Sequence, residues 1–399
     1  MGFVLEATEK LNGWIYNNGW SGYDPFDVLG TPAILSVLGI SARRRARWIR
    51  LPAVFLVRRF PKASRLLLRV KKAVNAKAMA LFVRAYLNLY ECFKKEEYLD
   101  RALTCISWLE KNFSKGYSAH CWGYPFDWQS LMFFPKGTPS GVVSCIAGHA
   151  FLDAYDLLGR RRYLKVSEEI CRFILNDLNG KEYNNKLCFS YTPMDDYEVH
   201  NANLWCASLL ARVAFHTKND LFKKTAIKAV NFTLSDQRDD GAWRYWSTRY
   251  ASQKSIKRNV IDNYHTGFII ECLMDCDRYI SHLNVKDPIQ KGINFYVKNL
   301  FLDESIPKWS PNNIYPIDIH SCAQTIITLA KYSKVSKQRL NMIRKVALWT
   351  IKNMQDEKGF FYYRMYRWGI DKTPHIRWGQ AWMLLALSRL CKTYDAQIM

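Results

Sequence analysis

Apolar residues recur at helical spacing in a repeated pair of segments along most of the 399-residue chain. The first segment of each pair, such as residues 76–93, is apolar around most of its circumference, whereas the second, such as residues 96–113, carries charge on one side. A helix that is apolar all round is buried, so the alternation predicts an inner and an outer ring of helices. The inner segments begin near Ala76, Val142, Asn201, Tyr264, Ile319 and Ile376.

The repeat also predicts how the ring closes. Complete pairs continue to about Gln355, and the last apolar segment, residues 376–394, has no partner after it. The N-terminal segment from Val4 to Tyr16 can supply that partner. We therefore expect an all-α fold, an (α/α)6 toroid in a single domain, in which residues 1–75 give the closing helix and a basic helical extension and residues 76–399 give the helical hairpins.

The connections between helices fall into two classes. The breaks inside each pair are short, whereas the returns from an outer to the next inner helix are long and hold a disproportionate share of the Trp and Tyr residues. All the long returns must lie at one end of a toroid, and loops gathered on a rigid scaffold are where sites are built. The long returns are residues 115–141, 237–265, 303–320 and 355–380.

Charge and aromatic content narrow the expected partners. The chain has a net charge of +23, and 15% of its residues are aromatic. Residues 43–77 mix basic residues with apolar clusters, which is typical of a helix on an anionic membrane surface. A helix that packs on the toroid and turns its basic face to solvent explains the same pattern equally well. We expect a carbohydrate or lipid-linked glycan as substrate and no nucleic acid as partner.

The cysteine pattern and the absence of targeting signals indicate a compartment. The 11 cysteines are scattered without a CxxC motif, and the chain starts without a secretory signal pattern. No uninterrupted apolar run approaches the roughly 18 residues that a membrane span needs. These features favour reduced thiols in the cytoplasm, with peripheral attachment at the inner membrane face as an extension of that prediction.

Two turns share a motif in which Gln is followed by three residues, Gly, one residue and an aromatic residue. They are residues 237–243 and 355–361, and they resemble the QW motif of terpenoid cyclases, which are also α/α toroids. The glutamine can satisfy backbone groups at a helix end, and the glycine permits the turn. The acidic DxDD motif of those cyclases is absent. We interpret the likeness as one of fold and keep a terpenoid cyclase-like toroid as an alternative.

Five further segments, WGYPFDWQ, HNANLW, IDNYHTGF, YPIDIHSCAQ and IRWGQAW, are similar to those of the six-hairpin glycosidase and sugar-epimerase superfamily. The branch they resemble is poorly characterised and is associated with capsule, O-antigen and surface-glycan synthesis. The resemblance covers nearly the whole chain. It implies carbohydrate chemistry on an (α/α)6 barrel.

Polar residues cluster where four of the inner helices begin. A helix N-terminus carries free N–H groups and partial positive charge, so these positions direct polar groups into a common opening. Simple N-capping explains Asp262 and Asp318 equally well. The clusters comprise His200, Asn201 and Asn203; Asp262, Asn263 and His265; Asp318, His320 and Gln324; and Arg377, Trp378 and Gln380.

Glycoside hydrolysis needs two carboxyl groups that flank the sugar. The candidates are Asp127, Asp262 and Asp318, with Asp24 and Asp27 in reserve. Aromatic residues near these acids can form stacking platforms and exclude water. The aromatic candidates are Trp122, Tyr124 and Trp128 around Asp127, together with Trp243 and Tyr245 in the next long return.

A uronate epimerase or lyase needs a base for the C5 proton and cations for the enolate-like carboxylate. The positive charge of the chain favours such an anionic substrate. A structural, hydrogen-bonded histidine explains either His position as well. The bases are His265 and His320, the acids are Tyr264 and Tyr315, and the carboxylate partners are Arg364, Arg367 and Arg377.

Metal and cofactor chemistry have little support in the sequence. Asp318, His320 and Cys322 point in different directions from one helix, and no glycine-rich phosphate loop occurs, so we expect neither a metal nor a nucleotide cofactor. The sequence thus favours an enzyme of surface-glycan metabolism, first as a hydrolase with paired carboxylates and second as a uronate epimerase or lyase. A non-catalytic glycan-binding assembly factor at the membrane is a third reading.

Overall fold

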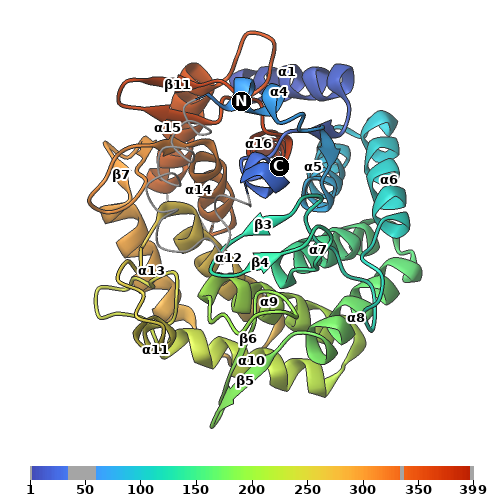
Figure 1. The fold of residues 1–399 in the computed structure, drawn as a ribbon, viewed down its shortest axis with the longest axis vertical. Helices are drawn as coiled ribbons and strands as arrows, with labels where there is room; N and C mark the ends of the chain where they lie inside the picture. Colours follow the sequence, from blue (N-terminus) through green and yellow to red (C-terminus); the bar gives the residue numbers. More distant parts are fainter. Residues whose placement is uncertain (1, 35–59, 333–336, 396–399) are drawn as a thin grey trace.

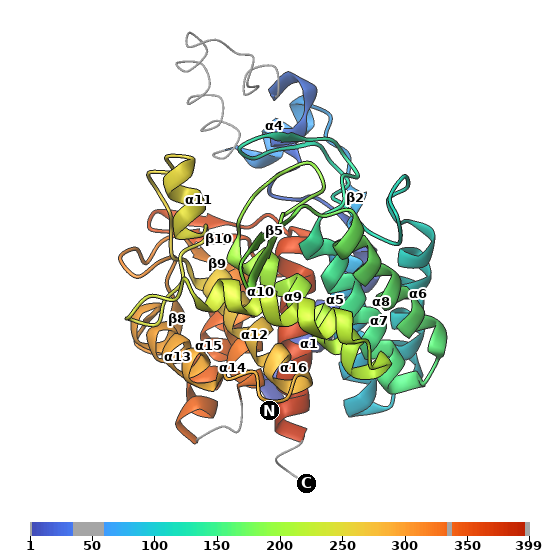
Figure 2. The same ribbon diagram turned by 90° about the horizontal axis from the view of Figure 1, so that it is seen from below.

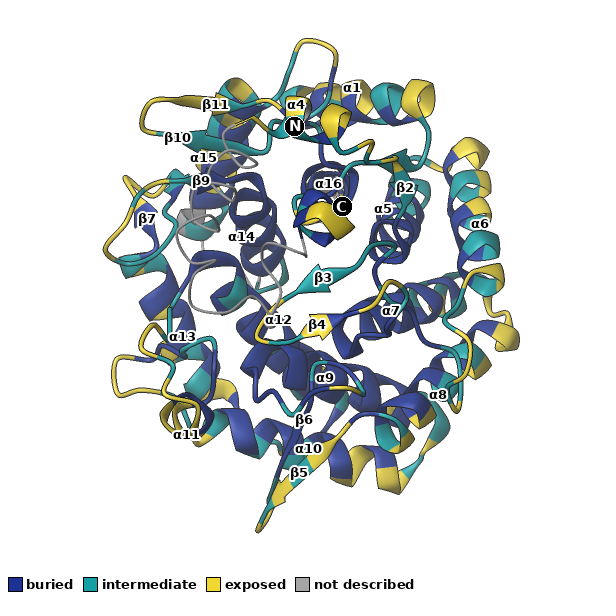
Figure 3. Ribbon diagram, viewed as in Figure 1, coloured by how far each residue is buried: buried dark blue, intermediate teal, exposed yellow. Residues whose placement is uncertain are grey.

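The described helices form two concentric rings around one axis (Figure 1). The computed structural model describes residues 2–34, 60–332 and 337–395. The inner ring is buried and the outer ring exposes one face to solvent (Figure 3), as the alternation of apolar and amphipathic segments predicts. The all-α toroid expected from the sequence is confirmed.

In the described part of the chain, six inner helices alternate with six outer helices, and α1, the first helix of the chain, is the outer helix that closes the ring. The inner helices are α5 (Ala76–Phe93), α7 (Gly141–Leu158), α9 (His200–Thr217), α12 (Asn263–Tyr279), α14 (Ile319–Lys331) and the π-helical η3 (Ile376–Ala381), which continues as α16 (Trp382–Asp395). The outer helices are α6 (Glu96–Lys111), α8 (Arg161–Asn176), α10 (Asp220–Leu234), α13 (Lys286–Asn299), α15 (Lys337–Met354) and α1 (Gly2–Asn18).

The N-terminal helix α1 closes the ring by packing on α15 and α16. Two glutamines show that it takes the place of an ordinary outer helix. Gln237 Nε2 donates to Gly241 O and to Pro288 O of α13, both at 3.0 Å. Gln355 Nε2 donates to Gly359 O and to Ala7 O of α1, both at 2.9 Å. The two QW-like turns therefore tie α10 to α13 and α15 to α1, which is the structural role expected of them.

The remaining elements lie in the connections. Figure 2 shows α4, α11 and β2 on one side of the rings, with the end of α16 on the other. The two-stranded antiparallel sheets are β1–β2 (Ser21–Gly22, Ala73–Val74), β3–β4 (Trp128–Gln129, Phe133–Phe134), β5–β6 (Gly180–Tyr183, Lys186–Phe189) and β7–β8 (Phe301–Leu302, Ile306–Pro307). A three-stranded sheet joins β9 (Ile317–Asp318), β10 (Arg364–Tyr366) and β11 (Gly369–Asp371), and the short helices are η1 (Val28–Gly30), α4 (Pro61–Leu67) and α11 (Thr248–Gln253).

The basic segment expected at a membrane is described only in part, because residues 43–59 lie outside the described ranges. Within α4, Arg65 is buried and pairs with Asp27 at 2.9 Å, while Leu66 and Leu67 are exposed. One inner helix, α7, is long and apolar enough to cross a membrane by length and composition. However, 72% of it is buried inside the toroid, which is the environment of a core helix.

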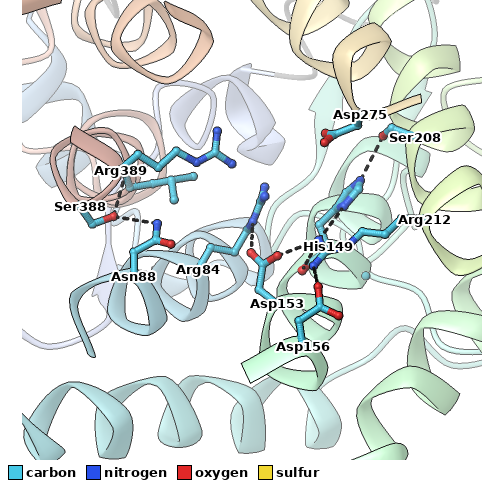
Figure 4. Close-up of polar contacts among 12 residues, drawn as sticks. Arg84, Asn88, His149, Asp153, Asp156, Ser208, Arg212, Asp275, Ser388 and Arg389 are labelled. Atoms are coloured by element: carbon cyan, nitrogen blue, oxygen red, sulfur yellow. Dashed lines mark hydrogen bonds and ion pairs between the residues drawn. The ribbon is translucent and has the colours of Figure 1, made fainter. Parts of the chain in front are cut away.

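Ion pairs and hydrogen bonds link neighbouring inner helices along their middle and later turns (Figure 4). Asp153 of α7 accepts from Arg84 Nε of α5 at 2.8 Å and from Arg212 Nη1 of α9 at 2.7 Å. On the facing helices, Glu271 accepts from Arg389 at 2.7 Å and from Gln324 at 2.9 Å. Charge-assisted bonds thus join α5, α7 and α9 in one set and α12, α14 and α16 in another.

The two carboxylates are held in their charged form. Burial raises the pKa of Glu271, but the positive charges of Arg389, Lys331 and Arg84 lower it by more than burial raises it. The pKa therefore lies well below its usual range. The pKa of Asp153 is likewise lowered by Arg84 and Arg212 against the opposing effect of burial. The two carboxylates therefore stay ionised at neutral pH.

The Gly241→Ala substitution tests the turn that joins outer helices. Gly241 has φ +89°, and an added Cβ would lie 2.4 Å from Lys291 O. We expect the free energy of unfolding to fall by about 2–4 kcal/mol, since left-handed strain and overpacking add. Gly116→Ala is the matched control, because Gly116 has φ +86° with nothing within 4 Å. Equal losses in urea unfolding would contradict this account of the turn.

The Glu271→Gln substitution tests the charge network. The side chain is 1% exposed and its partners would be left without a counter-charge, so we expect a loss of about 3 kcal/mol in urea unfolding at pH 7. Because the folded pKa is lowered, the contribution of Glu271 is complete above the unfolded pKa of about 4.3 and is lost as the pH falls toward the folded pKa. The gap between wild type and variant should narrow on acidification. In the control Glu182→Gln, at an exposed pair with Lys228, the change should stay within about 0.5 kcal/mol.

Candidate active site at the mouth of the toroid

The inner helices converge on one cavity at the rim that carries the long returns. The cavity has a volume of about 280 Å³, close to the lower end of the ~300–1,000 Å³ range of small-molecule pockets. Each inner helix contributes its second residue to the lining. These six residues are Lys77, Val142, Asn201, Tyr264, His320 and Arg377.

Aromatic side chains form most of the wall. Of the 19 lining residues, 11 are Phe, Tyr or Trp, which suits stacking against the apolar face of a ring. Burial raises the pKa of Tyr124, Tyr245 and Tyr264, so these phenols stay protonated and can donate hydrogen bonds. The aromatic lining residues are Phe26, Tyr124, Phe126, Trp128, Tyr191, Tyr197, Tyr245, Trp246, Tyr264, Phe268 and Trp378.

His265 is oriented by the residue that caps its own helix. Asp262 is the N-cap of α12 and accepts from the His265 backbone N at 2.9 Å. The other oxygen of Asp262 lies 2.6 Å from His265 Nδ1. An ionised carboxylate at Nδ1 favours the tautomer with the proton on that nitrogen, which leaves the Nε2 lone pair available to a ligand. The pair has the arrangement of an oriented general base.

His320 is buried in an aromatic box and neither ring nitrogen has a hydrogen-bond partner among the described residues. Tyr264 stacks on it with ring centroids 4.8 Å apart, and Trp382 lies at the same centroid distance. Burial, together with the charge of Lys77, holds the pKa of His320 well below its usual range. The imidazole is therefore neutral at neutral pH and able to accept or donate a proton.

Tyr264 lies between the two imidazoles. Its ring centroid is 4.3 Å from that of His265 and 4.8 Å from that of His320. The geometry thus places two histidines and one phenol along the same wall of the cavity, on α12 and α14. The sequence predicts His265 and His320 as bases and Tyr264 as an acid.

The candidate carboxylates, in contrast, are held away from the cavity surface. Asp318 is fully buried and accepts from His320 N at 2.9 Å, Arg364 Nε at 2.6 Å and Trp378 Nε1 at 2.8 Å. Asp24 binds Arg377 through both oxygens. The remaining reserve, Asp27, pairs with Arg65.

Asp127 lies in the return between α6 and α7, where it accepts from Lys136 N at 2.5 Å. Its neighbours Tyr124, Phe126 and Trp128 line the cavity. None of the cavity-lining residues in the described part of the chain is Asp or Glu. The carboxylates expected to flank a sugar therefore act on the protein itself: they cap helices and fix arginines.

Several other residues predicted to bind substrate instead stabilise the fold. His200 Nε2 binds Asp236 at 2.8 Å, and Asn203 donates to Ala229 O at 2.9 Å. Gln324 binds Glu271 in the lumen network. Their polar atoms are used by contacts to α10, to the segment that follows it or to the lumen network, and these side chains do not line the cavity.

The other predicted site residues that do not line the cavity are held by local contacts or lie on the surface. The indoles of Trp122 and Trp243 are buried and donate to Leu109 O and Thr233 O. Gln380 binds both backbone groups of Phe361. Tyr315 is exposed outside the lining. Arg364 is committed to Asp318.

The structure adds residues that the sequence did not single out. Tyr191 and Tyr197 come from the return between α8 and α9, and Trp246 follows Tyr245 in the next return. Lys77 lies in the first turn of α5. No group of three or more His, Cys, Asp or Glu side chains in the described part of the chain could hold a metal ion.

No protein-family model matches the sequence, and no curated protein matches it significantly. Solved structures do match. Cellobiose 2-epimerase from Bacillus thermoamylovorans aligns with a TM-score of 0.62 at 12% identity, over 82% of this chain and 90% of that chain. A GH76 α-mannanase of Bacteroides thetaiotaomicron gives 0.62 at 12% identity, over 83% and 89%. A polysaccharide lyase gives 0.57 at 11% identity, over 80% and 90%.

These structures are (α/α)6 toroids of the six-hairpin glycosidase-like superfamily. The resemblance noted in the sequence is confirmed at the level of the fold. Identities this low define an architecture, and one architecture hosts several reactions, so the chemistry has to be argued from the cavity.

Proposed function

We propose that the protein is a carbohydrate-active enzyme that moves a proton at a sugar carbon, as an epimerase, isomerase or lyase does. The observation that carries the proposal is His320. A neutral imidazole with two unpartnered nitrogens, buried to 1% exposure beside a cavity, is costly unless a ligand uses it. The aromatic walls supply the stacking surface that a sugar ring needs.

The two histidines suit complementary roles. Asp262 holds His265 with Nε2 free, so His265 fits the base that removes a proton from the carbon next to a carbonyl or carboxylate. His320 fits the second proton donor or acceptor. In an epimerase the proton leaves one face of the carbon and a proton returns to the other, so the bonding balances without a co-reactant. The phenol of Tyr264 can donate a hydrogen bond to the oxygen on which charge develops.

Paired-carboxylate hydrolysis has less support. That reaction needs one protonated and one ionised carboxyl group on either side of the sugar, whereas Asp24, Asp262 and Asp318 are each bound to a cation, an imidazole or a helix terminus. A terpenoid cyclase is disfavoured too, because Lys77, His265, His320 and Arg377 make this a polar cavity. The resemblance to surface-glycan proteins supports a glycan unit as the substrate.

Deuterium incorporation in D2O tests the proposal. Free hexoses and uronic acids are incubated with the protein, and NMR follows exchange at each sugar carbon. We expect exchange at one carbon, and we expect His320→Asn or His265→Asn to slow it by about 100-fold or more, since general acid–base groups contribute 10²–10⁴-fold. His282→Asn, an exposed histidine in a loop, should leave the rate unchanged.

Three results would count against the proposal. The first is no exchange in any sugar. The second is full exchange in both cavity variants. The third is release of new reducing ends from an oligosaccharide without carbon exchange, which would restore the hydrolase.

A further inference from the structure

The cavity has an uneven distribution of charge. Its lining contains Lys77, Arg377, His265 and His320, but no Asp or Glu among the described residues. A cavity lined by one sign of charge raises the local concentration of the opposite sign. These four groups differ in whether the protein itself supplies a partner for their charge.

Arg377 and His265 each have a carboxylate partner. Arg377 donates from Nε to Asp24 Oδ2 at 2.5 Å and from Nη2 to Asp24 Oδ1 at 2.7 Å. His265 binds Asp262. His320 is neutral for the reasons given above. None of these three basic groups therefore brings an unpaired positive charge to the cavity.

Lys77 is the exception. It is 4% exposed, and the structure gives its ammonium group no hydrogen bond or ion pair with any described residue. Its Nζ lies over two aromatic rings, 5.4 Å from the centroid of Trp382 and 5.8 Å from that of Phe268. Cation–π contacts compensate only part of the cost of burying a charge. The amine faces the cavity without a counter-ion.

The groups around Lys77 explain how the fold tolerates a buried amine at this position. Burial and the neighbouring charge of Arg377 lower the pKa of Lys77 well below its usual range, and Asp24 opposes this only in part. His320, on α14, lies against Trp382 as Lys77 does and is neutral. An anion beside Nζ would reverse the effect and stabilise the ammonium form.

We propose that the sugar bound in this cavity carries an anionic group, and that Lys77 forms the ion pair with it. That the ligand is a sugar rests on the proposed function. The carboxylate of a uronic acid is the group that fits best. It would lie on the same wall as His320, and pairing it with Lys77 would stabilise the charge that develops when a neighbouring proton leaves.

Binding of matched sugars tests the role of Lys77 without requiring turnover. Calorimetry compares glucuronate with glucose, galacturonate with galactose, mannuronate with mannose, and each neutral hexose with its 6-phosphate. We expect at least one anionic member to bind about 10- to 100-fold more tightly than its neutral partner, the range of one charge-assisted hydrogen bond. Whether the carboxylates or the phosphates show the preference identifies the group.

Three variants test whether Lys77 causes the preference for an anionic sugar. Lys77→Met should reduce the preference to about threefold or less, Lys77→Arg should keep most of it, and Lys223→Met, on the exposed face of α10, should leave it intact. Lys77→Met removes a buried amine without changing the side-chain volume much, so its thermal midpoint should match or exceed that of the wild type.

Two outcomes overturn the inference: no anionic sugar preferred over its neutral partner, or a preference that survives in Lys77→Met. These outcomes are separate from a failure of the proposed function. Carbon exchange with neutral sugars alone would leave the acid–base proposal standing and remove the role of Lys77. Lys77-dependent binding of a uronate without carbon exchange would support the role of Lys77 and contradict the acid–base proposal.

Discussion

The common starting rim of the inner helices is the constraint on which the rest of the structure depends. Each hairpin returns to this rim through a long connection, so the second residue of every inner helix faces the same space. Side chains in the first turn of a helix also lie near its free N–H groups. The acidic caps Asp262 and Asp318 satisfy those groups and stay behind the cavity wall. Tyr264, His265 and His320, two or three places after these caps, form part of the wall itself.

The lumen is therefore divided along its axis. At the rim, aromatic rings surround two imidazoles and a lone lysine. Further along the inner helices, Arg84, Asp153, Arg212 and Glu271 pair with one another or with nearby partners. These paired charges link neighbouring inner helices. Binding and stability thus use different segments of the same helices.

The sequence predicts the fold well because periodicity reports burial directly. The alternation of apolar and amphipathic segments gives both rings, and the lone segment 376–394 correctly indicates that α1 closes the toroid. The site is predicted only in part. A polar residue at a helix start can cap the helix, bind an outer helix or face the cavity, and the sequence does not distinguish these outcomes for Asp318, His200 and Asn201. The register of all six helices, which requires the folded ring, decides between them.

Lys77 is a cavity residue that the sequence did not single out. It is a single basic residue at the start of an apolar helix, and it continues a basic segment, so composition assigns it to a charged surface. Its importance follows from its position, second in α5, equivalent to that of His320 in α14. A comparison of equivalent positions between the repeats would have pointed to Lys77 before the structure was known.

A crystal structure with a bound sugar acid tests the central claim most directly. The account predicts one sugar unit in the rim cavity, with a ring carbon beside His265 and His320, an aromatic face beneath it and its anionic group at Lys77. A sugar bound elsewhere on the toroid, with the cavity filled only by water, would contradict the account.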